Sequence, residues 1–318
     1  MKAWSWSALV AGVGFSLISL VSMVADRFFW VADLINFFRP HIFVVGLLLG
    51  AACAALRTPR SMLLGLVVVA SGIAPMVSLP RSAAGSDGLV YKVVSANLLI
   101  EVRNPDTSLL ENYLRRVKPD LLVTQETLPV WEEPLRRSSG LAFESSRDLA
   151  ARDDIKLISR YPITSERVIE DPGLERHPIR FEIAAASGPI IVYAIHPDTP
   201  RSIDQWRQRN RYLGLVTKSV KSEPKGSRIV VVGDWNTPNW SPFYRDVLMQ
   251  AELYSTERRR WPSPSRFSTR YGSLVALGTP IDHIAVSSNV GVQAFDTGPA
   301  FGSNHVPVLA ELLLSDRL

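Results

Sequence analysis

The sequence predicts an α/β domain that follows a hydrophobic amino-terminal arm. Long uncharged runs are confined to the first 80 residues, whereas continuous Val/Ile/Leu runs typical of buried strands recur after residue 88 and alternate with helical patterns. A hydrophobic fraction of 47% with 20% charged residues excludes a disordered chain. The single Cys among 318 residues excludes an internal disulfide framework and a cysteine zinc site.

The net charge of +5 comes from the arm. Residues 1–82 hold six of the 35 basic residues and two of the 30 acidic ones, which leaves 29 basic and 28 acidic residues on the remaining 236. The α/β domain is therefore nearly neutral, and a nucleic-acid partner is less favoured than a membrane.

Three uncharged runs, at 3–25, 40–56 and 61–80, predict three transmembrane helices within an anchor over residues 1–81. The first and third are long enough to cross a hydrocarbon core of ~30 Å, and the second is near the lower limit of ~17 residues. Lys2 also fits the charged start of a cleaved signal peptide, but two further hydrophobic segments favour an anchor.

Aromatic and charged residues alternate over 26–39, which is typical of a segment at the headgroup level; an ordinary loop is the alternative. The expected spans place equal numbers of Lys and Arg residues on the two sides of the membrane. Because Asp26 and Asp33 offset the arginines of this segment, we favour an inside amino terminus and an extracytoplasmic carboxy-terminal domain.

Small polar residues at 82–88 predict a linker, and residues 89–318 then form the second domain. A helix is expected from residues 104–106 to Val117, and a capping-box pattern at Ser202 predicts another to about Lys221. Strands are expected at 89–98, 121–125, 181–186, 190–196, 228–235, 281–287 and 306–313.

Polar side chains stand at the ends of six of these strands. Each has an ordinary explanation as a cap, a solvated turn acid or a packed histidine. Taken together, carboxylates, amides and imidazoles are the groups that bind a hard cation and a phosphoryl group. The candidates are Asn97, Gln125, Glu126, His196, Asp234, Asn236, Asp282, Asn304 and His305.

The order of these groups resembles that of the endonuclease/exonuclease/phosphatase superfamily over residues 89 to about 314, as does the ISRYP stretch at 158–162. The resemblance implies a four-layer sandwich of two mixed β-sheets flanked by helices. The arm before the domain is similar in layout to the membrane-bound branch associated with teicoplanin resistance, which implies the bacterial inner (cytoplasmic) membrane.

The resemblance also implies roles around a cation. Asn97 and Glu126 would hold Mg²⁺ or Mn²⁺, which prefers oxygen ligands. Asp234 would position or deprotonate the attacking water, and Asn236 would orient that water and the phosphate oxygens.

Two histidines would complete the site. His305 would stabilise the charge of the transition state, with Asp282 holding its ring, and His196 would donate to a phosphate oxygen from the opposite wall. The superfamily has Asp before its last histidine, whereas this chain has Asn304, which puts a second metal site in doubt. A noncatalytic phospholipid-binding module is therefore a further alternative.

Other polar and aromatic residues carry weaker signals. A solvated basic face is favoured over phosphate contact for Arg201, Arg207, Arg209 and Arg211. Three aromatic residues follow Asp234, and we expect them to line either the substrate entrance or the core: Trp235, Trp240 and Phe243.

The arm and the resemblance together predict a membrane-anchored, Mg²⁺-dependent phosphoesterase. Its substrate would be a phosphate ester or diphosphate, on a lipid or another membrane-associated molecule, because a short linker concentrates the domain at the headgroups. A metal-dependent endonuclease or exonuclease is the alternative, although it would need a basic groove. The expected partners are the bilayer and the phosphorylated substrate, with no obligate protein partner.

Overall fold

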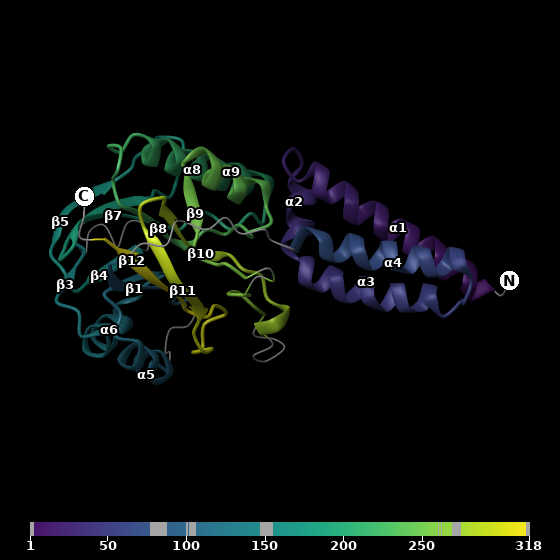
Figure 1. Ribbon diagram of the computed structural model, residues 1–318, viewed down its shortest axis with the longest axis horizontal. Helices are drawn as coiled ribbons and strands as arrows, with labels where there is room; N and C mark the ends of the chain where they lie inside the picture. The colour runs from purple at the N-terminus through teal and green to yellow at the C-terminus, as the bar shows by residue number, and fades with distance from the viewer. Residues whose placement is uncertain are drawn as a thin grey trace.

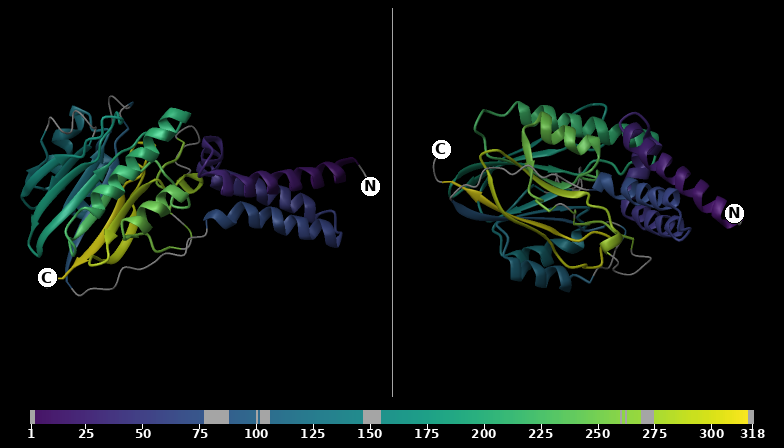
Figure 2. Two further views of the ribbon diagram at one scale, coloured as in Figure 1. Left: turned by 90° about the horizontal axis from the view of Figure 1, so that it is seen from above. Right: turned by 45° about the vertical axis from the view of Figure 1, so that its right-hand side comes forward.

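The structure is a computed structural model that describes residues 3–76, 88–99, 101, 106–146, 155–259, 261, 263–268 and 275–315. A helical arm projects from a sandwich of sheets and helices (Figures 1 and 2). The arm contains α1 (Ala3–Ala25), α2 (Trp30–Phe37), α3 (Arg39–Ala54) and α4 (Pro59–Ile73). The helices of the sandwich are α5 (Ser108–Val117), α6 (Glu132–Ser139), α8 (Ile203–Lys221) and α9 (Pro242–Gln250).

The described strands form two mixed six-stranded sheets. The order is β11-β12-β1-β2-β4-β3 in one and β5-β6-β7-β8-β10-β9 in the other, and the pairs β1–β2 and β7–β8 are parallel. The strands are β1 (Leu89–Asn97), β2 (Leu121–Gln125), β3 (Phe143–Glu144), β4 (Ile155–Ser159), β5 (Ile163–Val168), β6 (Ile179–Ala185), β7 (Gly188–Ile195), β8 (Ile229–Asp234), β9 (Leu253–Ser255), β10 (Asp282–Ser287), β11 (Gly291–Thr297) and β12 (Val308–Leu314).

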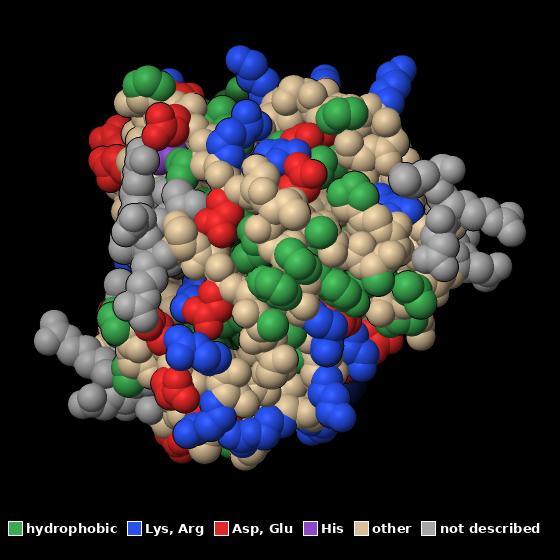
Figure 3. Space-filling view, turned by 90° about the vertical axis from the view of Figure 1, so that its left-hand side faces the viewer, with side chains coloured by type: hydrophobic (Ala, Val, Ile, Leu, Met, Phe, Trp, Pro, Cys, Tyr) green, Lys and Arg blue, Asp and Glu red, His purple; other side chains and the backbone are tan. Residues whose placement is uncertain are grey.

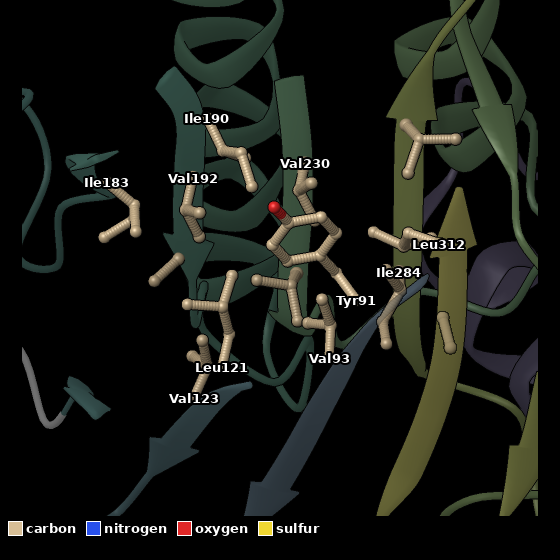
Figure 4. Close-up of a cluster of buried hydrophobic side chains, with 14 of the residues drawn as sticks. Tyr91, Val93, Leu121, Val123, Ile183, Ile190, Val192, Val230, Ile284 and Leu312 are labelled. Carbon is tan, nitrogen blue, oxygen red and sulfur yellow. The ribbon is translucent and has the colours of Figure 1, made fainter. Parts of the chain in front are cut away.

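The two sheets pack face to face over the main core. Alternate residues of β1 and β2, such as Tyr91, Val93 and Val123, point into it and meet Val192 and Ile284 of the other sheet (Figure 4). The intervening residues face outward against helices, α5 and α6 on one sheet and α8 and α9 on the other. This arrangement confirms the predicted α/β sandwich and explains why its central strands are apolar on both faces.

The arm agrees only in part with the prediction of three transmembrane helices. The apolar stretch Ser5–Ala25 of α1 is long enough to cross a membrane, α2 and α3 are bent by 74° to one another, and α4 has only 15 residues. At 1.5 Å per residue, α4 is shorter than a hydrocarbon core of ~30 Å. Residues 77–80 of the expected third span and 82–87 of the expected linker lie outside the described residues.

Helix α2 joins the arm to the sandwich through two hydrogen bonds, in each of which an indole N–H donates to a backbone carbonyl. Trp30 donates its indole N–H to the carbonyl of Pro200 at 2.9 Å. Trp240 donates in the same way to the carbonyl of Asn36 at 2.9 Å. The segment expected at the headgroup level is therefore in part a docked helix, which contacts the loops that follow β7 and β8.

Candidate active site

The register of the sheets gathers the polar strand ends at one edge. The ends of the parallel strands β1 and β2 lie together, as do those of β7 and β8, and β10 begins beside the end of β8. The pairs are Asn97 with Gln125, Ile195 with Gly233, and Asp282 with Asp234.

Gly233 lets the two central strands of the second sheet approach each other. Its φ is +145°, and a Cβ at this position would lie 2.0 Å from the carbonyl oxygen of Ile195. A larger residue would push these strands apart, so glycine is required immediately before Asp234.

Asn97 connects two of the carboxylates. Its amide Nδ2 donates to Glu126 Oε1 at 2.9 Å and to Asp234 Oδ2 at 3.2 Å, while its Oδ1 accepts from the backbone N–H of Leu99. Glu126 has a φ of +56°, a left-handed conformation that is costly for a side chain with a Cβ and is often found at functional sites.

Asp282 and His305 form a buried pair. His305 Nδ1 lies 2.8 Å from Asp282 Oδ2, and its Nε2 lies 3.8 Å from Asp234 Oδ2. Burial by itself would lower the pKa of His305, but the charge and hydrogen bond of Asp282 outweigh it and raise the pKa. The charged form of the ring is therefore favoured, and its Nε2 faces Asp234.

His196 approaches the same carboxylates as a neutral ring. Arg176 donates to its Nδ1 at 2.9 Å, which places the ring proton on Nε2, 3.7 Å from Glu126 and 3.8 Å from Asp234. Burial and then the charge of Arg176 lower the pKa of His196 to about 3. Arg176 has no strand-end position and was not among the sequence candidates.

Asn236 shapes the turn after β8. Its backbone N–H donates to Asp234 Oδ1 at 2.8 Å, and its φ is +45°. Its side-chain amide donates to the carbonyl of Pro197 and accepts from the hydroxyl of Thr199. The turn thus fixes Asp234, while the expected role of Asn236 toward water and phosphate stays a prediction.

The donor set fits a divalent cation. Ligand atoms of Asp234, Asp282 and His305 lie within 4.8 Å of one another, and all three residues are buried. Within the described residues, Asp282 Oδ1 is buried without a hydrogen-bond partner, which is costly unless a ligand binds it. Because the charged form of His305 has no free lone pair, the carboxylate oxygens of Asp234, Asp282 and the nearby Glu126 are the groups that would hold the cation. The metal-binding role expected for Asn97 remains a prediction.

The loop before β12 is tied to β1. Ser303 donates its hydroxyl to the carbonyl of Asn97 at 2.8 Å and accepts from the N–H of His305 at 3.0 Å. The adjacent Asn304 has a buried Oδ1 without a hydrogen-bond partner in the described part of the chain. Ser303 is thus a supporting residue, and it was not among the sequence candidates.

One weaker expectation is corrected, and one alternative that the sequence left open is decided. Arg209 is not part of a solvated face, because it is fully buried and pairs with Asp33 of α2 at 2.7 Å. Trp235 lies in the core and Trp240 is buried against α2, so neither is an open substrate entrance.

The endonuclease/exonuclease/phosphatase family model matches residues 94–305. Among solved structures, sphingomyelinase C from Streptomyces griseocarneus is 15% identical with a TM-score of 0.51, covering 70% of this chain and 99% of that one. Humanized D. rerio TDP2 with 14 mutations is 15% identical with a TM-score of 0.56, covering 70% and 98%. A family protein from Beutenbergia cavernae is 16% identical with a TM-score of 0.54, covering 71% and 72%.

At these identities the solved structures show a shared fold. No curated protein sequence matches the chain. The family match, in contrast, covers about two thirds of the chain and includes every polar strand end from Asn97 to His305. The chain therefore belongs to the endonuclease/exonuclease/phosphatase family and is a metal-dependent phosphoric ester hydrolase.

Proposed function

We propose that the protein is a membrane-anchored, Mg²⁺-dependent phosphoesterase whose substrate is a phosphorylated lipid or another membrane-associated phosphate ester or diphosphate. One observation carries this proposal: the arm docks on the same edge of the sandwich as the site. Trp240, which contacts α2, lies four residues after Asn236, and Thr279, which donates to the carbonyl of Phe37 at 2.8 Å, lies three residues before Asp282.

The surface of the arm supports insertion in a membrane. Exposed apolar side chains cover it, including Val10, Leu17, Val21, Leu48, Leu63 and Leu66. Water does not favour such a continuous apolar surface, whereas lipid does. Phe28 and Phe29 are also exposed, at 79% and 58%, where the arm meets the sandwich. They suit the interface between lipid and headgroups.

Glycines bring α3 and α4 into close contact. A Cβ on Gly65 would lie 2.7 Å from the carbonyl oxygen of Gly50, and one on Gly50 would lie 2.7 Å from a methyl group of Val69. Close approach at small residues is typical of helices that pack within membranes. These contacts support an anchor over residues 1–81 that crosses the bilayer more than once, as in the membrane-bound teicoplanin-resistance branch.

The chain's own groups suit attack of water on a phosphoryl group. Burial and then the charge of Asp282 raise the pKa of Asp234 to about 7, so this carboxyl group can exchange a proton with water near neutral pH. The Nε2 atoms of His305 and His196 face the same point, Asp234 Oδ2, and as N–H donors they would bind phosphate oxygens. A bound cation would supply further positive charge to the phosphate.

The near-neutral charge after residue 82, with 29 basic and 28 acidic residues, favours a lipid over a nucleic acid. The solved relatives include both a sphingomyelinase and a TDP2 complexed with a single-strand DNA product, so the fold alone does not select a substrate. On the face of the sandwich remote from the arm, Lys and Arg side chains are interspersed with Asp and Glu (Figure 3). Mixed charge of this kind does not form a phosphate-binding track on that face.

Hydrolysis by the purified full chain tests the proposal. In detergent with Mg²⁺, it should release phosphate or a phosphorylated headgroup from lipid phosphates, lipid diphosphates or sphingomyelin, and EDTA should abolish this release. Plasmid DNA is the competing substrate, and Asp234→Asn is the inactive control. Cleavage of DNA alone would establish a nuclease, and inactivity toward every substrate would establish the noncatalytic alternative.

A further inference from the structure

Arg266 lies between the site and the arm. Its backbone forms isolated bridges with Thr279 on one side and with His305 on the other. Its guanidinium carbon lies 5.9 Å from the centre of the Phe37 ring, which α2 contributes. Phe37 of the arm thus packs against the guanidinium of Arg266, whose backbone pairs with that of His305.

The guanidinium of Arg266 is half-buried, yet among the described residues it has no side-chain hydrogen bond and no ion pair. The charges of Asp234, Asp282 and Glu101 attract it electrostatically, whereas the charge of Arg201 repels it. Its planar set of donors is therefore available. Such a set of donors favours an anionic ligand.

This anion is distinct from the reacting phosphoryl group, which the donors of His196 and His305 would bind beside Asp234. Paired backbones lie about 5 Å apart, so the segment of Arg266 is the immediate neighbour of His305. A substrate with two phosphoryl groups joined through one oxygen carries its second anionic group next to the reacting one, which suits a cation in this neighbouring segment.

We propose that Arg266 forms an anion subsite beside the reacting phosphoryl group, and that the substrate is a diphosphate ester. The inference rests on the proposed function, because it assigns the second charged group of the same substrate. Water attacks the terminal phosphorus, and the bond from that phosphorus to the bridging oxygen breaks. The electron pair stays on the oxygen of the monophosphate ester, whose charge Arg266 offsets, and one proton of the water passes to Asp234 and then to solvent.

Calorimetry on the full chain in detergent, with free Mg²⁺ held constant, tests the subsite without turnover. Methylenediphosphonate is the diphosphate probe, and inorganic phosphate is the single-phosphate probe. Because charge-assisted hydrogen bonds are strong, the wild type should bind the diphosphonate about tenfold or more tightly than phosphate. Arg266→Gln should reduce this preference to about twofold and leave the affinity for phosphate within about twofold.

Two variants control for folding and for general charge. Arg259→Gln removes an exposed arginine of the preceding segment that pairs with Asp296 at 3.2 Å, and it should behave as wild type. Arg266→Lys should fold and keep part of the preference, since it keeps the charge. Equal affinity of the wild type for both probes, or equal weakening of both by Arg266→Gln, would overturn the subsite whether or not any lipid is hydrolysed.

Turnover distinguishes two sources of the diphosphate. A lipid diphosphate in mixed micelles should be hydrolysed faster than a soluble nucleoside diphosphate at equal concentration, because α2 places the subsite beside the arm. Preference for the nucleoside diphosphate, combined with the expected calorimetry, would support the subsite and overturn a lipid substrate.

Discussion

The hydrogen bond between Asp282 and His305 decides the charge of an imidazole that faces the phosphate position. Asp282→Asn keeps the size of the side chain but removes the negative charge that raises the pKa of His305. Turnover should therefore fall by about 10²-fold or more at pH 7, with a small change in KM. Steady-state kinetics on the best substrate measure this, with the exposed Asp296→Asn as the matched control. Unchanged turnover would show that His305 does not act as a cation.

Glu257 makes stability depend on pH. Burial raises the pKa of this carboxyl group from 4.5 to about 7, so the folded chain binds more protons than the unfolded chain between these values. The contribution of Glu257 to the free energy of unfolding is most favourable below about pH 4.5 and is lost as the pH rises to about 7. Glu257→Gln should therefore lose less stability than wild type between pH 5 and pH 8, by on the order of 2 kcal/mol.

Thermal unfolding of both proteins in the same detergent at the two pH values checks the role of Glu257. Groups that titrate in both proteins cancel in the comparison. Parallel changes in unfolding temperature for wild type and Glu257→Gln would contradict the expected linkage.

A chain of buried contacts connects α2 to Asp234. Asp33 pairs with Arg209 at 2.7 Å, Arg209 donates to the carbonyl of Asn236 at 3.3 Å, and Asn236 donates to Asp234 at 2.8 Å. Loss of one partner of a buried pair leaves an unpaired charge and costs about 3–5 kcal/mol. Arg209→Met should therefore lower both the unfolding temperature and the turnover.

A second variant separates positioning from stability. In Asp33→Asn with Arg209→Gln, no charge is buried, so the unfolding temperature should recover while turnover stays about tenfold or more below wild type and KM is unchanged. Arg207→Met, on the exposed face of α8, is the control. Recovery of turnover together with stability would show that Arg209 has a structural role only.

Most central strands and the helix after Ser202 were predictable because local signals and tertiary packing agree there. The helix expected after Ser202 is α8, with Ser202 as its cap. Helix α9, which Ser241 caps, was missed. Strand β4 was missed although it is buried, because Lys156 interrupts its apolar pattern. Of the other missed strands, β5 is half-exposed along its length, and β11 contains a bulge. Helix α2 was missed because its aromatic residues satisfy contacts with distant loops rather than a local pattern.

The residues of the candidate site also divide into those that local sequence signals reveal and those that only the fold reveals. Residues at the ends of buried strands, such as His196 and Asp234, were predictable because polar groups there need a ligand or a partner. Arg176 and Arg266 were not assigned, and Arg209 was assigned to a solvated face, because their importance depends on which distant groups the fold brings beside them. For Arg209 the partner is in the arm, which no periodicity of α8 could reveal.

The distribution of charge along the arm gives the orientation of the whole molecule a physical basis. The amino terminus and the α3–α4 turn lie at the end remote from the sandwich (Figure 1). Arg57 and Arg60 are exposed at that turn. Arg39, at the opposite end, is fully buried and bonded to Ser19, Ser22 and Asn36, and Arg27 pairs with Asp246.

Because free positive charges are retained on the cytoplasmic side, the remote end should be cytoplasmic and the sandwich extracytoplasmic. In a bacterial host, alkaline phosphatase fused after Leu318 should be active and green fluorescent protein fused there should be dark. Substitution of Arg57 and Arg60 together by Gln should weaken this bias, whereas Arg39→Gln should change it less, since Arg39 is buried and hydrogen-bonded within the arm. A dark phosphatase fusion with a bright fluorescent one would reverse the orientation and place the substrate in the cytoplasmic leaflet.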